Sequence, residues 1–175
     1  LDWDFESASW EGDKSPKSME EIYSMEMEDF IQLLLSFNKK SWDEPNRDGL
    51  LLEFSKSIKG DCKWACNVLS VLIERKIDVE DIWSYLISGI NNADFTLQEY
   101  LEIFERLEDS KIFCNYNKEM ACLLEKCIDL QDTKKEYQVY KERLHALADK
   151  LWIFRQQNEE MNEARLIDRC VNCST

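Results

Sequence analysis

Apolar side chains recur at spacings of three and four residues in one segment after another, and this periodicity is the strongest constraint on the fold. Phe30, Leu34 and Phe37, for example, follow the 3.6-residue period that places side chains on one face of an α-helix. Only four glycines and two prolines interrupt the 175 residues, too few for the regular turns of a β-sandwich. The pattern therefore predicts an all-α fold.

Polar residues that cap backbone N–H groups mark several helix starts. Ser18 with Glu21, and Thr96 with Glu99, have the spacing of a capping box, and Asp78 is placed to cap a further helix. After a short helical turn at Ser18, the predicted helices cover residues 26–38, 46–59, 62–76, 78–92, 96–107, 116–129, 133–157 and 161–171.

Helices of this length, joined by short turns, form either a bundle or a stack of hairpins. Units of about 40 residues favour stacked antiparallel helical hairpins, as in an α-solenoid or a HEAT-like superhelix fragment. We expect an N-terminal linker or arm over residues 1–17 and an α-helical repeat domain over 18–175. Because the chain begins with Leu1, we interpret it as a fragment of a longer protein.

The net charge of −14 is unevenly distributed. Residues 134–175 hold eight basic and seven acidic side chains, so the rest of the chain carries −15. Such a surface repels nucleic acid, which makes nucleic-acid binding an unfavourable interpretation. No apolar run approaches the roughly 20 residues of a membrane span, and no signal peptide is visible.

Seven cysteines, an odd number, favour reduced thiols and a cytoplasmic location. Cys170 and Cys173 have zinc-ligand spacing, but no second Cys-x-x-Cys pair completes a four-ligand site. His145, the single histidine, lies within a predicted helix and has no nucleophile motif nearby. Glu74-Arg75-Lys76 contains the Glu-x-Lys of metal-dependent nucleases, yet its basic residues also suit a helix end. We therefore predict no catalytic residue, metal or cofactor.

The longest predicted helix carries apolar residues in a heptad pattern over about two and a half repeats. This seam consists of Tyr137, Tyr140, Leu144, Leu147, Leu151 and Phe154. Its short length favours packing within the chain, while a coiled coil or a partner-helix interface is the alternative. Together with Trp152 and Arg155, whose residue types are enriched at interfaces, the seam is the candidate partner-binding region.

Three segments carry a family resemblance. Residues 24–37 have an acidic helix start before an apolar helix, and residues 48–64 have a helix, a tight turn and the next helix. Residues 82–90 have a helix with Gly89 as the small residue at a close contact. In this order they resemble the α-helical repeat regions of large bacterial multidomain proteins. Those regions commonly follow signal-transducing NTPase domains of the STAND or NACHT type or other effector domains, and many act in anti-phage defence.

The resemblance implies a non-catalytic repeat scaffold that senses or assembles, with a protein partner, neighbouring domains of the same chain or an oligomer as its contacts. The resemblance does not imply a catalytic role for any residue of this sequence. The alternative is the helical domain of a hydrolase or nuclease with a site built from scattered carboxylates and His145. A third hypothesis, an acidic mimic of nucleic acid, requires carboxylates in a regular two-row track.

Overall fold

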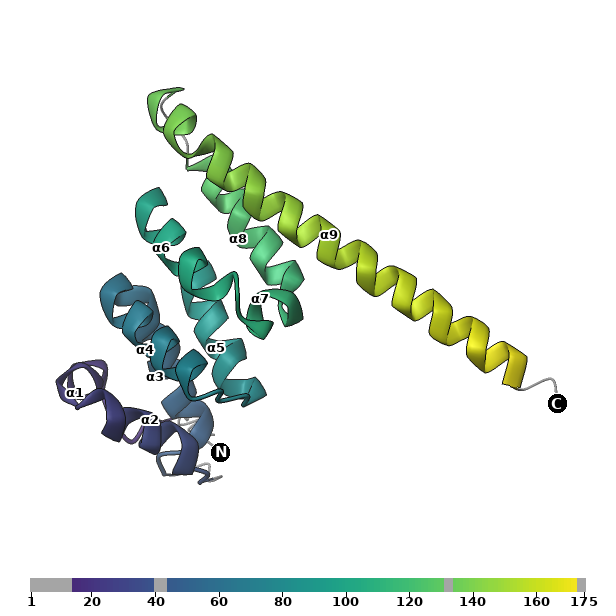
Figure 1. Ribbon diagram of the computed structural model, residues 1–175. Helices are drawn as coiled ribbons and strands as arrows, with labels where there is room; N and C mark the ends of the chain where they lie inside the picture. The colour runs from purple at the N-terminus through teal and green to yellow at the C-terminus, as the bar shows by residue number, and fades with distance from the viewer. Residues whose placement is uncertain (1–13, 40–43, 131–133, 173–175) are drawn as a thin grey trace, which may run out of the picture. The chain divides into compact units, whose positions relative to one another are not determined.

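The computed structural model describes residues 14–39, 44–130 and 134–172, with side chains described for all of these except 134–138 and 159–172. Within this part of the chain the regular secondary structure is α-helical and contains no strand, which confirms the all-α class (Figure 1). The contacts divide the chain into two compact units, Leu1–Ala93 and Asp94–Thr175. The helical domain expected over residues 18–175 spans both of them.

The first unit contains α1 (Met19–Ser24), α2 (Met27–Ser36), α3 (Arg47–Gly60), α4 (Cys62–Glu74) and α5 (Glu80–Asn91). The helices predicted over 26–38, 46–59 and 62–76 therefore agree with α2, α3 and α4 to within two residues at each end. Aromatic rings fill much of the core: Phe30, Phe54 and Trp64 have ring centroids between 5.2 and 6.2 Å apart. Each aromatic pair of this kind adds about 0.5–1.5 kcal/mol beyond the burial of its area.

Both predicted capping boxes are present. The backbone N–H of Glu21 donates to Ser18 Oγ at 3.3 Å, and the N–H of Ser18 donates to the Glu21 carboxylate at 2.9 Å. Thr96 and Glu99 make the same reciprocal pair at the start of a helix in the second unit. Each box satisfies two N–H groups that the first helical turn leaves without a partner.

The prediction that Asp78 caps α5 is wrong. The N-cap residue is Val79, which makes no side-chain capping hydrogen bond. Upstream, the backbone N–H of Ile77 bonds to the carbonyl of Leu72, and Trp83 Nε1 donates to the carbonyl of Ile77 at 2.8 Å. These local bonds, over five and six residues, hold the connection from α4, and the N-cap lies one residue later than the local pattern indicates.

Helices α3 and α5 approach each other closely at Gly89. A Cβ atom at this position would lie 2.7 Å from the Ser55 carbonyl oxygen and 2.9 Å from the Ile58 Cβ atom, both on α3. The expected role of Gly89 as the small residue at a close contact is therefore confirmed. A larger side chain would push the two helices apart.

Arg47 joins the ends of three helices in this unit. Its Nε and Nη2 atoms donate to the two carboxylate oxygens of Asp81, at the start of α5, over 2.6 and 2.9 Å. Its Nη1 atom donates to the carbonyls of Leu34 and Phe37, at the end of α2, each over 2.8 Å. Helix ends leave such carbonyls without intrahelical partners, so the Arg47 side chain completes the hydrogen bonding of α2 while it fixes α5.

The second unit contains α6 (Leu97–Leu107), α7 (Lys111–Asn115), α8 (Asn117–Asp129) and α9 (Lys134–Asn172). Helix α7 was not predicted, because five residues are too few to show a helical period. The predicted separation of a helix ending near 157 from another over 161–171 is wrong, since α9 runs through both. The intervening residues contain Gln, Asn and Glu but no Gly or Pro, and nothing in them breaks a helix.

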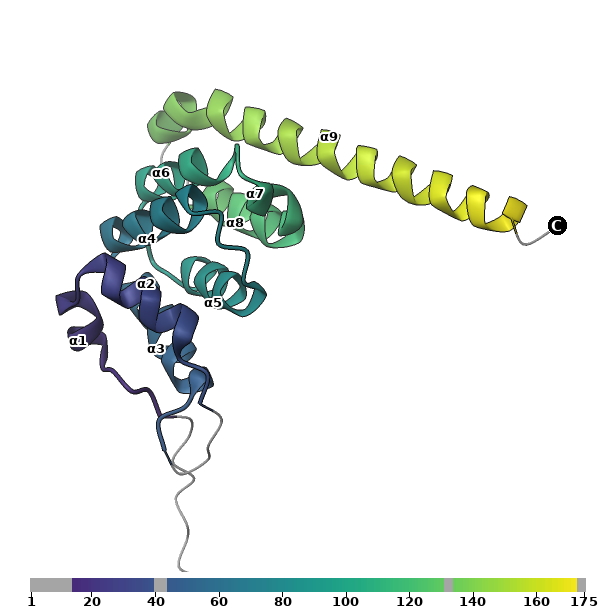
Figure 2. The same cartoon turned by 60° about the horizontal axis from the view of Figure 1, so that its bottom comes forward.

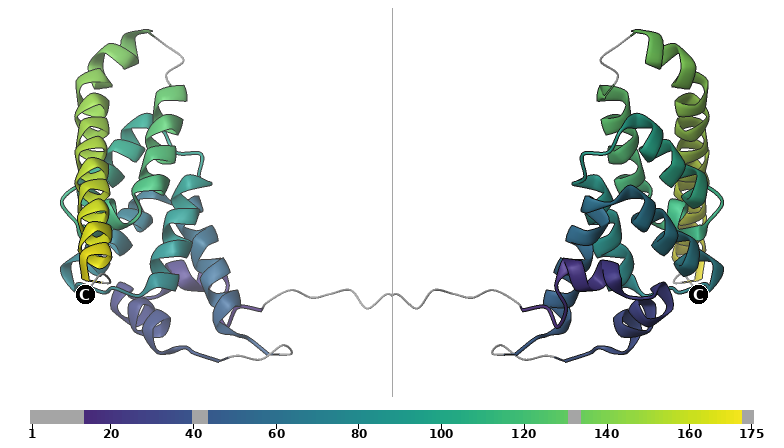
Figure 3. Two further views of the ribbon diagram at one scale, coloured as in Figure 1. Left: turned by 90° about the vertical axis from the view of Figure 1, so that its right-hand side faces the viewer. Right: turned by 90° about the vertical axis from the view of Figure 1, so that its left-hand side faces the viewer.

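Helices α8 and α9 form an antiparallel hairpin, and they lie side by side in Figure 1 and in both views of Figure 3. The core of this unit includes Phe104 and Phe113, whose rings meet edge to face at 6.3 Å, together with Leu123 and Leu144. The hairpin thus positions one face of α9 against the unit and leaves its other face to solvent.

Candidate functional site

The heptad seam of α9 faces the interior of the protein. Leu144, Leu147 and Leu151 are 2%, 1% and 8% exposed, and α9 contacts α8. Tyr140 and Phe154, at the two ends of the seam, are half-buried, and the Tyr137 side chain lies outside the described residues. The three leucines are therefore occupied by packing within the chain, the arrangement that the short seam favours.

The opposite side of α9 carries large apolar side chains in contact with solvent. Trp152 is 60% exposed and Ile153 is 54% exposed. Arg155 is exposed as well, but it lies four residues after Leu151 and so is closer to the seam side of the helix. In Figures 1 and 2, the C-terminal part of α9 extends well beyond the other helices of its unit. Among the predicted partner-binding residues whose side chains are described, Trp152 and Arg155 are the exposed ones, and Tyr140 and Phe154 are half-buried.

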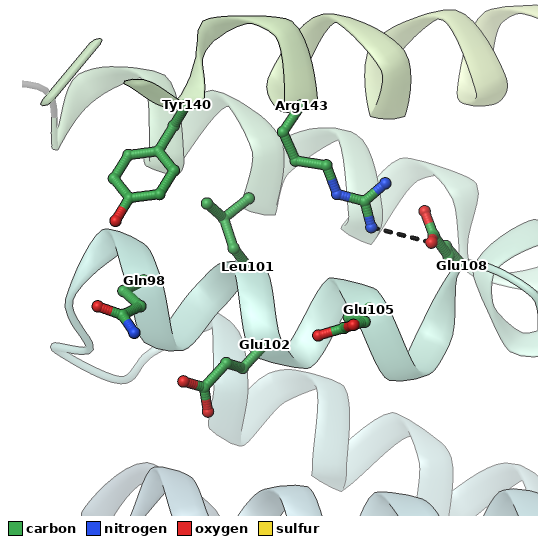
Figure 4. A pocket seen from close by; sticks show the side chains of 7 residues that line it. All are labelled: Gln98, Leu101, Glu102, Glu105, Glu108, Tyr140 and Arg143. Carbon is green, nitrogen blue, oxygen red and sulfur yellow. Dashed lines mark ion pairs between the residues drawn. The ribbon is translucent and has the colours of Figure 1, made fainter. Parts of the chain in front are cut away.

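A groove of about 440 Å³ lies between α6 and the first turns of α9 (Figure 4). Its lining residues are Gln98, Leu101, Glu102, Glu105, Glu108, Tyr140 and Arg143. In Figure 4, Tyr140 and Arg143 reach from α9 toward α6, and Leu101 points from α6 toward α9. The groove combines a small apolar surface with several charged groups.

Ion pairs connect α9 to the end of α6. Arg143 Nη2 lies 2.9 Å from Glu108 Oε1, and Lys150 Nζ lies 2.8 Å from Asp109 Oδ1. The hydrogen bond to Glu108 raises the pKa of Arg143, and the hydrogen bond from Lys150 lowers the pKa of Asp109. Lys150 also lies 5.9 Å from the centre of the Phe113 ring, a cation–π distance. Basic residues of α9 therefore complement the acidic end of α6.

The other two acids of the groove, Glu102 and Glu105, form no direct ion pair in the described part of the chain, although Arg143 attracts Glu105 from a longer distance. Arg143 is paired with Glu108, and no described cation forms an ion pair with Glu102 or Glu105. Arg106, on the same helix, donates to the backbone carbonyl of Glu102 and does not line the groove. The groove is consequently acidic.

The residues considered for catalysis do not meet in this groove. His145 is exposed and is not one of the lining residues. Searched over the described residues, no group of three or more His, Cys, Asp and Glu side chains could hold a metal ion. Glu74 ends α4, and Arg75 at its C-cap forms an ion pair with Glu28, so the Glu74-Arg75-Lys76 triplet lies at a helix end as its basic residues suggest.

The cysteines occupy several environments. Cys62, Cys66 and Cys127 are buried, and burial raises the pKa of the Cys127 thiol to about 12. That thiol therefore stays protonated at neutral pH, which is unfavourable for a nucleophile. The Cys170 side chain and Cys173 lie outside the described residues, so their zinc-like spacing is not described structurally.

The groove was missed at the sequence level because it forms between residues far apart in the chain. Glu108 and Arg143 belong to different helices, and no local pattern connects them. One signal was present: Glu102, Glu105 and Glu108 recur every third residue, a row along one side of a helix.

Comparisons of the chain with protein-family models, with curated proteins and with solved structures give no match. Among the described residues, no helix combines the length and the apolar character needed to cross a membrane.

Proposed function

We propose that this chain is a non-catalytic helical scaffold or sensor segment that contacts another protein, or a neighbouring domain of its own parent protein, through α9. The exposed Trp152–Ile153 pair on a helix whose other face is already packed is the observation that carries this proposal. Exposed aromatic residues are enriched in the energetically dominant parts of protein interfaces.

The wider context of the proposal comes from the sequence resemblance. The segments 24–37, 48–64 and 82–90 support a repeat region of a larger cytoplasmic bacterial signalling or defence protein of the STAND or NACHT type. Stacking of helical hairpins in a HEAT-like superhelix is part of the same proposal. The antiparallel α8–α9 hairpin is the kind of unit from which such a stack is built.

Site-specific photo-crosslinking in the cells of origin tests the proposed surface. A photoreactive phenylalanine analogue replaces Trp152 in one variant and Leu52 in another. Leu52 is 42% exposed on α3, so it provides an exposed apolar position on a helix of the other unit. We expect a discrete crosslinked protein species from position 152 and none from position 52. Equal yields, or no adduct from position 152, would contradict a contact through this face of α9.

A further inference from the structure

The groove between α6 and α9 presents apolar and acidic groups in a defined order. Leu101 and Tyr140 supply apolar surface, while Glu102, Glu105 and Glu108 outnumber the one cation of the described lining, Arg143, which bonds to Glu108 and also attracts Glu105. Opposite charges across an interface steer association and select partners. A ligand that covers this groove must therefore bring positive charge together with apolar side chains.

The spacing of the groove carboxylates is similar to the spacing of side chains on one face of a second helix. Glu102 and Glu105 on α6 and Glu108 at its C-cap are three residues apart, so they rise by about 4.5 Å per step along the helix axis. Side chains at i and i+3 or i+4 of a second helix lie about 5–6 Å apart. Lysine or arginine residues at these positions can follow the acidic row, and apolar residues beside them can reach Leu101 and Tyr140.

We propose that the α6–α9 groove binds a basic amphipathic helix of a protein partner. This inference rests on the proposed partner-binding function and adds the chemistry of one partner segment. The helix lies along α6, as amphipathic helices lie in grooves of helical proteins. Its cations pair with Glu102 and Glu105, and its apolar side chains cover Leu101 and the Tyr140 ring.

A synthetic probe tests the groove directly. A labelled peptide of about 15 residues, with Lys and Arg at i, i+3 and i+4 steps and Leu beside them, is titrated with the whole chain and followed by fluorescence anisotropy. We expect saturable binding that weakens as salt is raised, because exposed charge pairs are screened. Replacing both carboxylates, Glu102→Gln with Glu105→Gln, should weaken binding by about tenfold.

The matched control removes the same charge elsewhere in the unit. Glu119 and Glu125 are exposed carboxylates on α8 and do not line the groove. The double variant Glu119→Gln with Glu125→Gln should bind the peptide within about twofold of the unmodified chain. A shuffled peptide of the same composition, without the amphipathic pattern, should bind more weakly than the patterned one.

Three outcomes would overturn the proposal. The first is absence of saturable binding to the unmodified chain. The second is equal weakening by the α6 and α8 variants, which would indicate attraction to the net charge alone. The third is equal binding of the shuffled peptide. None of them bears on the crosslinking from position 152, so failure of the groove and failure of the proposed function remain distinguishable.

Discussion

At the residue scale, the structure depends on a few side chains that serve more than one element. Arg47 is the clearest case, because its guanidinium bonds to Asp81 and to two carbonyls of α2. Removing such a group would leave several polar atoms without partners at once, which costs more than the loss of one hydrogen bond. The sequence marks the arginine as one more charge at a helix start, and only the tertiary structure shows what it connects.

The pairing with Arg47 makes the stability of the first unit depend on pH. Hydrogen bonding to Arg47 lowers the pKa of Asp81 below its ordinary value. A carboxyl whose pKa is lower in the folded state contributes stability that is present above the unfolded pKa, about 3.9, and is lost as the pH falls through the folded value. We therefore expect thermal unfolding to show a loss of stability below about pH 4 that is smaller in Asp81→Asn. Identical acid profiles for the two proteins would contradict this role of Asp81.

A second residue-scale prediction concerns the close contact at Gly89. Adding a methyl group there brings it within 2.7 Å of a backbone oxygen of α3, so Gly89→Ala should destabilise the protein by about 1–3 kcal/mol in urea unfolding. Gly60→Ala is the control, because its Cβ would meet only the end of the Tyr23 side chain and no backbone atom. A shift of that hydroxyl disturbs its hydrogen bond to the Ser57 carbonyl, so a smaller loss of stability is expected. Equal effects of the two substitutions would show that the α3–α5 contact has room for a methyl group.

At the element scale, local patterns identified most helices but not their exact ends. Capping boxes at Ser18 and Thr96 were predictable because the interacting residues are three apart. The start of α5 was not: its N-cap is Val79, which makes no side-chain capping bond, and Ile77 just before Asp78 bonds to Leu72 and Trp83. For the candidate site, the sequence indicated Trp152 as a partner-binding candidate by its residue type, and its exposure comes from the structure. The α6–α9 groove requires knowledge of which helices are neighbours.

Helix α9 separates a structural face from an exposed face, and substitutions on the two should behave differently. Leu147 is fully buried, so Leu147→Ala should cost about 2–5 kcal/mol of unfolding free energy through lost burial and a cavity. His145, two residues earlier, is exposed, and His145→Ala should change stability by about 0.5 kcal/mol or less. Denaturant unfolding of both variants measures the difference. A neutral effect of Leu147→Ala would mean that α9 does not bury its seam.

At the scale of the whole molecule, the boundary between acidic and nearly neutral sequence differs from the boundary between the two compact units. The acidic excess belongs to residues 1–133, while α9 and the residues after it are nearly neutral. Packing instead divides the chain after Ala93, so α9 shares a unit with the acidic helix α6. The ion pairs Arg143–Glu108 and Lys150–Asp109 are the local result, since they join the charge-balanced segment to an acidic one. The periodicity of apolar residues alone predicts neither the charge boundary nor the boundary between the two units.

The division after Ala93 predicts that the second unit folds by itself. Its aromatic pair Phe104–Phe113, its buried leucines on α8 and α9 and its two interhelical ion pairs all lie within Asp94–Thr175. A fragment of residues 94–175 should therefore show a helical circular dichroism spectrum and a cooperative thermal transition. Leu147→Ala in that fragment should lower its midpoint by about 8 °C or more, because a loss of about 2 kcal/mol or more is expected and 1 kcal/mol corresponds to about 4–8 °C in a domain of this size. A fragment that is unfolded, or that melts without cooperativity, would show that the second unit needs the first.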